Sequence, residues 1–190
     1  MRIGMHVRGF SLIELMIAIS IFALLIVLAG PIYGEFMANT QIRNAGESML
    51  NGVRLAQAQA VRYNLPTEFQ WSTTGWVVTT DDPENPGTPL PGSQEIYQVT
   101  EGAAQAKITP TPGAAKTVTF GGLGRIEANA DASPTLEVLD IVLDPAKSGI
   151  TTSRPLRIVV ANTTSASGTK LCDPDPVLKL ADPTNPQLCP

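Results

Sequence analysis

Glu14 is the residue whose chemistry and position are hardest to reconcile in this sequence. It directly precedes nineteen residues, Leu15–Tyr33, that contain no Asp, Glu, Lys, Arg or His. A charged side chain in hydrocarbon costs about 2.5–3.5 kcal/mol on insertion scales and by default marks a functional position. We therefore expect a cationic group to meet the carboxylate of Glu14 in the working state of the protein.

The other reactive residue types are few. The chain has one histidine, His6, and two cysteines, Cys172 and Cys189. A bridge between these cysteines would close a loop worth about 3 kcal/mol of stability, whereas a metal site or a reactive thiol would need further ligands nearby. Two acidic loops carry oxygen ligands that calcium could use. We expect these loops to be solvated instead; their acidic residues are Asp81, Asp82 and Glu84 in one and Asp173 and Asp175 in the other. No nucleophile–base pair is visible, so we expect no catalytic residue, no metal and no cofactor.

The apolar run has the length of a membrane span, which needs about 20 apolar residues. Arg2, His6 and Arg8 precede it without an acid, so the N-terminus should face the cytoplasm. A secretory signal peptide would have a shorter apolar run of about 7–15 residues and a small-residue cleavage site; Gly30-Pro31-Ile32-Tyr33 fits such a site poorly. A plain membrane anchor would leave Glu14 unexplained.

A helical pattern continues beyond the apolar run. Apolar side chains recur at steps of three and four and predict a buried helix face, with polar residues on the opposite side. Gly30 and Pro31 interrupt the helix and predict a kink, and Asn64 and Pro66 should end it. The predicted buried face consists of Ile42, Ala45, Met49, Val53, Ala56 and Ala60.

Strands and turns follow Pro66. Residues 81–92 carry four prolines and two glycines and should form an irregular loop, and residues 121–125 should form a glycine-rich turn rather than a phosphate loop. Trp71 and Trp76 should serve packing. The predicted strands are Thr67–Trp71, Gly75–Thr80, Glu95–Val99, Lys116–Phe120, Leu136–Leu143, Leu156–Ala161 and Thr169–Cys172.

Residues 9–14, GFSLIE, resemble the class III signal of type IV pilins and type II secretion pseudopilins. The resemblance implies that a prepilin peptidase cleaves between Gly9 and Phe10 and that Phe10 is then N-methylated. Glu14 would be the fifth residue of the mature chain and would pair with the N-terminal amine of a neighbouring subunit. This amine would be the cation that Glu14 requires. Cleavage would also remove His6, Arg2 and Arg8, which takes the formal net charge from −4 to −6.

The remainder of the chain resembles the GspH/FimT class of minor pilins and pseudopilins. The resemblance rests on the helix end at residues 55–66, on Gly75–Val78, on Val118–Phe120 with Gly124-Arg125, and on Arg157–Val160 leading to Gly168–Cys172. The chain departs from the class at Leu55-Ala56-Gln57, where Ala-Arg is usual. The implied fold is α+β, with a long N-terminal transmembrane and amphipathic helix packed on an antiparallel β-sandwich-like head.

This fold divides the chain into four segments. We expect a leader peptide at residues 1–9, a transmembrane and filament-core helix at 10–33, its amphipathic continuation at 34–66, and a β-rich head with a C-terminal disulfide loop at 67–190. The protein would sit in the bacterial inner membrane with a single pass, its N-terminus cytoplasmic and its head periplasmic, and would later enter a pilus or pseudopilus.

The expected function is that of a minor pilin, which primes or caps a type IV pilus together with other minor pilins. A C-terminal disulfide is common in such pilins and less expected in the alternative, a GspH-like minor pseudopilin of a type II secretion system. The expected partners are the prepilin peptidase/methyltransferase, minor and major pilins, and the inner membrane. A second alternative, a FimT-like DNA-binding pilin, would use Arg154, Arg157, Lys170 and Lys179, but the acidic mature chain argues against nucleic acid as a partner.

Overall fold

The computed structural model describes residues 11–85, 88–98, 103–149, 153–160 and 168–189, apart from the side chains of residues 29–32 and 98. It separates into two compact units, residues 1–37 and residues 38–190. We call the second unit the head. Helix α1 (Leu12–Tyr63) supplies the described part of the first unit and also the first element of the head.

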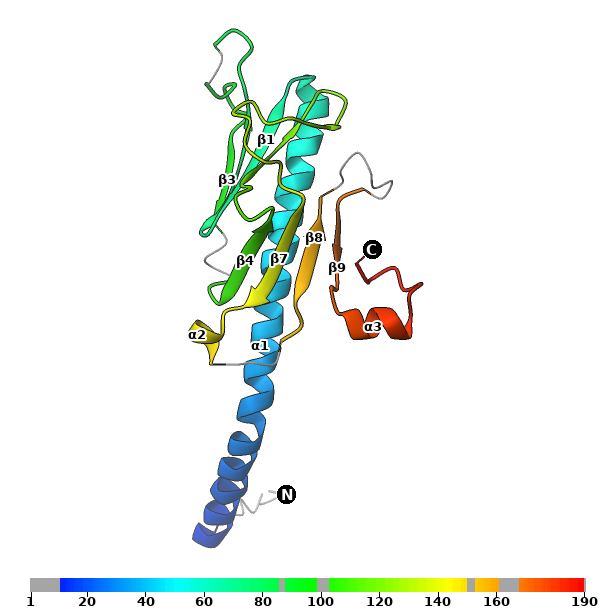
Figure 1. Ribbon diagram of the computed structural model, residues 1–190. Coiled ribbons are helices and arrows are strands. Elements are labelled where there is room, and N and C mark those ends of the chain that lie inside the picture. The colour runs from blue at the N-terminus through cyan, green and yellow to red at the C-terminus, as the bar shows by residue number, and fades with distance from the viewer. Residues whose placement is uncertain (1–10, 86–87, 99–102, 150–152, 161–167, 190) are drawn as a thin grey trace, which may run out of the picture. The chain divides into compact units, whose positions relative to one another are not determined.

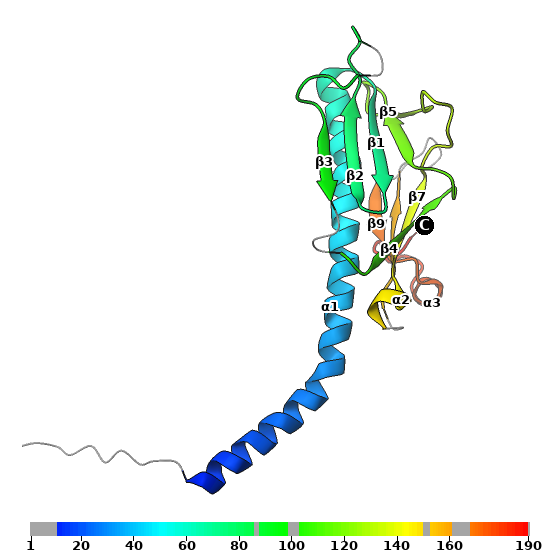
Figure 2. The same ribbon diagram turned by 90° about the vertical axis from the view of Figure 1, so that its left-hand side faces the viewer.

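In the head, α1 buries the face that the sequence predicts. The side chains of Ile42, Met49 and Val53 are completely inaccessible to solvent, as are Ala45, Ala56 and Ala60. Arg43, Glu47 and Arg54 are exposed on the opposite side. Both sheets lie on the same side of residues 38–63 (Figures 1 and 2), so one helix face is covered and the other meets solvent.

The C-terminal end of α1 is fixed by a left-handed residue. Asn64 has a φ of 52°, and the amide of Leu65 donates to the carbonyl of Ala60 at 3.2 Å. This is the 6→1 bond of a Schellman motif with Asn64 at C′. The prediction that the helix ends at Asn64 and Pro66 is therefore confirmed.

The first sheet is antiparallel and has five strands in the order β3-β2-β1-β5-β6. Its central hairpin pairs Trp71 with Trp76, and Phe69, Trp71 and Trp76 face the core. The indole of Trp76 donates to Ser48 Oγ of α1 at 3.1 Å, which ties sheet and helix together. The strands are β1 (Thr67–Ser72), β2 (Gly75–Thr80), β3 (Glu95–Gln98), β5 (Thr117–Phe120) and β6 (Ile126–Glu127).

The second sheet has four antiparallel strands in the order β4-β7-β8-β9. Leu139, Ile141 and Leu143 alternate inward along β7, and Ile141 approaches α1 at Gly46. The two sheets and residues 38–60 of α1 enclose one core, all of whose buried side chains lie in the head. The strands are β4 (Ala106–Thr111), β7 (Val138–Leu143), β8 (Leu156–Val159) and β9 (Lys170–Cys172).

Several elements were absent from the sequence-based prediction. They are β4, the short β6, helix α2 (Pro145–Ser148) and helix α3 (Pro176–Ala181). β4 carries Pro110, a residue that argues against a strand, and it lies at the edge of its sheet, where proline is tolerated. The strand predicted from Leu136 begins at Val138, while the predicted end residues Val99 and Ala161 lie outside the described residues.

Candidate functional site

The first unit presents apolar side chains on all sides. Every residue from Ser11 to Leu28 is exposed within this unit, and the large hydrophobic side chains are 54–77% exposed. We call residues 12–28 the apolar segment. A helix that is apolar all round is typical of a core or a membrane span. The large side chains of the apolar segment are Leu12, Ile13, Leu15, Met16, Ile17, Ile19, Ile21, Phe22, Leu24, Leu25, Ile26, Val27 and Leu28.

Glu14 lies in the first turn of α1, and its backbone is capped by Ser11. The amide of Glu14 donates to Ser11 Oγ at 3.2 Å, and the amide of Leu15 donates to the Ser11 carbonyl at 3.2 Å. Ser11 and Glu14 have the spacing of a capping box, a signal that the sequence-based reasoning missed. The positive end of the helix dipole favours a carboxylate at this position, and the side chain of Glu14 is exposed within its unit.

The remaining predicted positions of the first unit are only partly described. Gly9 and Phe10 lie outside the described residues. The backbone at Gly30 and Pro31 is helical, and the kink there stays a prediction. In the part of the chain that is described, no single helix is long and apolar enough to cross a membrane, but the bent pair Leu12–Leu28 and Tyr33–Tyr63 meets that test by length and composition.

In the head, Cys172 and Cys189 form a disulfide with an S–S distance of 2.08 Å and a Cα–Cα distance of 5.1 Å. The amide of Asp173 donates to the Gln187 carbonyl at 2.8 Å, and the amide of Cys189 donates to the Asp173 carbonyl at 3.0 Å. The chain before Cys189 therefore pairs with the end of β9. Inside the closed loop, Asp175 caps helix α3 by accepting from the amides of Val177 and Leu178.

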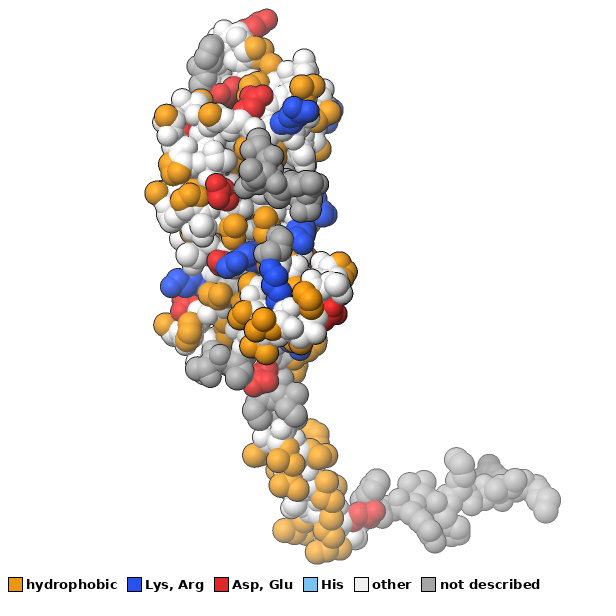
Figure 3. Space-filling model, turned by 45° about the vertical axis from the view of Figure 1, so that its right-hand side comes forward, with side chains coloured by type: hydrophobic (Ala, Val, Ile, Leu, Met, Phe, Trp, Pro, Cys, Tyr) orange, Lys and Arg blue, Asp and Glu red, His pale blue; other side chains and the backbone are white. Residues whose placement is uncertain are grey.

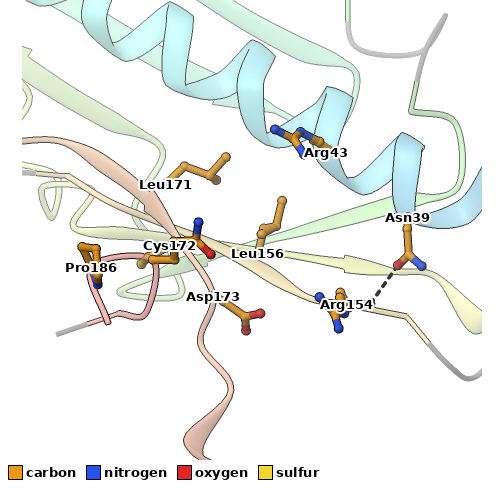
Figure 4. A pocket seen from close by; sticks show the side chains of 9 residues that line it. Asn39, Arg43, Arg154, Leu156, Leu171, Cys172, Asp173 and Pro186 are labelled. Carbon is orange, nitrogen blue, oxygen red and sulfur yellow. Dashed lines mark hydrogen bonds between the residues drawn. The ribbon is translucent and has the colours of Figure 1, made fainter. Parts of the chain in front are cut away.

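A cavity of about 470 Å³ lies beside the base of this loop. Asn39 and Arg43 of α1 line one wall, and β8, β9 and the C-terminal segment line the others (Figure 4). The backbone amide of Arg154 donates to Asn39 Oδ1 at 2.9 Å. The lining therefore combines aliphatic and charged side chains. It consists of Asn39, Arg43, Arg154, Leu156, Leu171, Cys172, Asp173, Pro186 and Gln187.

Two of the four basic residues considered for DNA binding are engaged by the protein itself. Arg157 forms a two-bond pair with Asp140, at 2.6 Å from Nε to Oδ1 and 3.1 Å from the second nitrogen to Oδ2. Lys170 Nζ donates to the Leu188 carbonyl at 3.4 Å. These contacts stabilise the second sheet and the C-terminal loop, and they weaken the interpretation of this region as a surface for phosphates.

The acidic loops are organised by hydrogen bonds within the chain. Asp82 accepts from the amide of Glu84 and the side chain of Asn85, and these bonds, chiefly that from Asn85, lower the pKa of the Asp82 carboxyl. Asp173 accepts from the amide of Asp175. Among the described residues, no three His, Cys, Asp or Glu side chains are grouped so that they could hold a metal ion.

None of the curated proteins matches the chain. Among solved structures, the type IV minor pilin FimU of Pseudomonas aeruginosa strain PAO1 is 12% identical and aligns over 74% of this chain and 92% of its own, with a TM-score of 0.48. The prokaryotic N-terminal methylation motif matches residues 4–30.

The family described as type II transport protein GspH matches residues 45–164, more than half of the chain. Its members are structural proteins rather than enzymes. The matched region begins inside α1 and extends through the described strands of the head to the end of β8. The chain therefore belongs to the GspH family and is a minor pilin or pseudopilin of the type IV pilin type.

Proposed function

We propose that this chain is a minor subunit of a type IV pilus, which primes or caps pilus assembly together with other minor pilins. The prepilin peptidase cleaves between Gly9 and Phe10 and methylates the new N-terminus at Phe10. The observation that carries the proposal is the apolar segment, whose large side chains are exposed all round the helix within their own unit. Such a surface needs an apolar environment before and after assembly: first the inner membrane, then the helices of neighbouring subunits.

Glu14 sets the axial position of one subunit relative to its neighbour in the assembled state. Apolar side chains pack without strong directional preference, so they do not by themselves fix how far one helix slides along another. A carboxylate exposed at the first turn of α1 binds a neighbouring N-terminal amine only at one axial position. Leaving it unpaired among apolar helices would be costly, because a buried unpaired charge destabilises strongly.

The disulfide supports a periplasmic head. Disulfides form in oxidising compartments such as the bacterial periplasm, and Cys172 and Cys189 are joined here. The basic residues that precede the apolar segment favour a cytoplasmic N-terminus. Both features agree with a single pass through the inner membrane.

Substitution of Glu14 tests the role of its charge. Glu14→Ala removes the charge and the polar end of the side chain, whereas Glu14→Gln removes only the charge, because glutamine can also occupy this position of a capping box. We expect both variants to insert and to be cleaved normally but to enter purified filaments about tenfold less, the loss expected for a charge-assisted hydrogen bond. Glu47→Ala, at a solvent-exposed position of the same helix, should behave as wild type.

Quantitative mass spectrometry of purified filaments measures incorporation, and the mass of the mature N-terminus reports cleavage and methylation. Normal incorporation of Glu14→Gln alone would assign Glu14 to helix capping and remove the pairing role. An intact leader in assembled subunits would contradict the whole proposal.

A second candidate is a minor pseudopilin of a type II secretion system, which is favoured by the match to the type II transport protein GspH family. Deletion of the gene separates the two. Loss of surface pili with unchanged secretion of exoproteins would support the pilus, and the reverse result would support the secretion system. Complementation with the wild-type chain controls for effects on neighbouring genes.

A further inference from the structure

The loop closed by the disulfide presents an apolar helix surface to solvent. α3 has no buried residue, and Val177 and Leu180 are 70% and 86% exposed. Carboxylates stand at both ends of the helix, since Asp175 is its N-cap and Asp182 its C-cap. The disulfide and the backbone pairing next to it hold the loop in place, so a partner would not have to order it on binding.

The cavity beside this loop has the complementary composition. Leu156 and Leu171, both half-buried, provide aliphatic surface, and the exposed Arg154 and Arg43 add guanidinium groups (Figure 4). Arg43 also pairs with Glu47 at 2.8 Å, but an exposed pair of this kind is weak and can exchange partners. The volume of about 470 Å³ falls within the range of about 300–1,000 Å³ typical of ligand pockets.

The two surfaces match in charge and in apolarity. The α3 surface joins aliphatic side chains to the carboxylates of Asp175 and Asp182, each of which accepts hydrogen bonds within the loop through Oδ1, and Lys179 is the basic residue on the helix. The cavity joins aliphatic side chains to guanidinium groups, which pair with carboxylates in a planar, two-bond geometry. Asp173, the carboxylate that lines the cavity, already accepts from the amide of Asp175. Figure 3 brings this side of the molecule forward and shows hydrophobic and basic side chains side by side on it.

We propose that two copies of this chain associate through their heads, with α3 of each copy seated in the Arg154-lined cavity of the other. The cavity and the loop share Asp173, Pro186 and Gln187, so the two complementary surfaces are neighbours on one molecule. Neighbouring complementary surfaces are what a twofold interface needs, because each contact is then repeated by symmetry. This association lies beyond the proposed assembly role and does not depend on the apolar segment.

The isolated head is a suitable sample, because all of the buried core lies in residues 38–190. Sedimentation equilibrium of this fragment in low salt, with the disulfide verified by thiol titration, should show a monomer–dimer equilibrium. Leu180→Ser and Arg154→Glu should each weaken dimerisation about tenfold, because truncation of a central anchor usually has a large effect. Leu123→Ser and Arg125→Glu change equally exposed residues away from the cavity and should leave the equilibrium unchanged.

Mixing the two variants gives a sharper result. Leu180→Ser keeps an intact cavity and Arg154→Glu keeps an intact α3, so a mixed dimer contains one undamaged contact that neither variant can form alone. Because the two side chains belong to one contact, the second loss in an already damaged contact should cost little, so the mixture should associate more strongly than either variant by itself. A head that stays monomeric up to millimolar concentration would overturn the proposal, and so would a dimer that responds equally to Leu180→Ser and Leu123→Ser.

A photo-crosslinking amino acid at position 180 tests the same contact in the full chain in native membranes. The expected product joins two copies of the chain through the peptide that contains Arg154 or Arg43, and a mixture of isotope-labelled and unlabelled chains distinguishes this product from a crosslink within one chain. A crosslink to another filament subunit in place of a second copy would overturn the proposed occupant.

Discussion

Residues 12–28 and residues 42–60 belong to the same helix and are both rich in apolar side chains, yet their burial differs. In the head, the apolar side chains form one stripe that the two sheets cover completely. In the apolar segment they surround the helix and are all exposed within their unit. Hydrophobicity alone thus does not decide burial; the distribution around the helix shows whether the chain covers its own surface or requires another one.

The largest effect should separate two methionines of α1. Met49 is fully buried, and Met16 is 54% exposed. Met49→Ala should lower the free energy of unfolding of the head by about 2–5 kcal/mol, because it removes buried contacts and leaves a cavity. Met16→Ala should leave it unchanged. Tryptophan fluorescence of the full chain in detergent measures this, since both tryptophans, Trp71 and Trp76, lie in the head; equal effects of the two variants would break the comparison.

The next effect concerns the covalent link, which the structure places in the head. Replacing Cys172 and Cys189 by serine should lower the free energy of unfolding by about 3 kcal/mol. The reason is that a covalent link between residues 17 apart in the sequence no longer restricts the unfolded chain. Denaturant unfolding measures the loss. A reductant should bring the wild type to the stability of the variant and should not affect the variant itself; a reductant without effect on the wild type would contradict the prediction.

A smaller effect tests how closely α1 approaches the first sheet. A Cβ at Gly52 would lie 2.7 Å from the rings of Phe69 and Trp76. Gly52→Ala should therefore destabilise the head by about 1–2 kcal/mol, since overpacking costs about 1–3 kcal/mol and outweighs a gain in helix propensity of about 1 kcal/mol.

Gly46→Ala is the matched control for Gly52→Ala. A Cβ at Gly46 would lie 3.1 Å from the end of the Leu171 side chain, which is flexible and can move, and at ordinary contact distances of 3.5 and 3.6 Å from the ends of Ile141 and Leu156. We expect a change near zero or a slight stabilisation in the same unfolding experiment. Stabilisation by Gly52→Ala would show that α1 lies further from the sheet than the structure indicates.

The smallest effect is the pH dependence of Glu68. Burial, and then the charges of Asp81 and Asp131, raise the pKa of the Glu68 carboxyl. A raised folded-state pKa means that protonation stabilises the head, so this contribution is complete below the ordinary value of about 4.5 and is lost as the pH rises through the folded-state pKa.

Glu68→Gln should accordingly match the wild type in acid and be slightly more stable at pH 7, whereas Glu84→Gln in an exposed loop should change stability little at either pH. Thermal unfolding at the two pH values measures the difference. A Glu68→Gln variant that is less stable than the wild type at pH 7 would reverse the assigned sign.

Much of the fold follows from local patterns that the sequence shows directly. Ile42 and Met49 recur at helical spacing, and Asn64 followed by Pro66 marks the helix end; both features are present in the structure. Both strands of the hairpin formed by β1 and β2 were also predicted, because residues 67–71 and 75–80 are β-prone runs separated by a short polar stretch. By contrast, β4 alternates between half-buried and exposed residues, and it is held in the sheet by its pairing with β7.

The candidate site likewise has a part that the sequence predicts and a part that only the structure shows. Glu14 beside its apolar run predicted a cationic partner without any knowledge of the fold, and this role stays a prediction; the cap from Ser11 was overlooked. The cavity at Arg154 was not foreseeable, because its walls come from α1, β8, β9 and the C-terminal segment. Its chemistry depends on residues that are distant along the chain, such as Asn39, which accepts a hydrogen bond from the amide of Arg154.

The sequence by itself determined the apolar segment with its carboxylate, the buried stripe of α1 and the helix end, because each depends on residues within a few turns of one another. Only the tertiary structure decided which basic residues are engaged, how closely Gly52 approaches the aromatic rings, and where the α3 surface lies beside its cavity. Those features depend on contacts between segments that are distant along the chain, such as Arg157 with Asp140 and Ser48 with Trp76. Residue types and spacing do not fix such contacts until the sheets have packed on the helix.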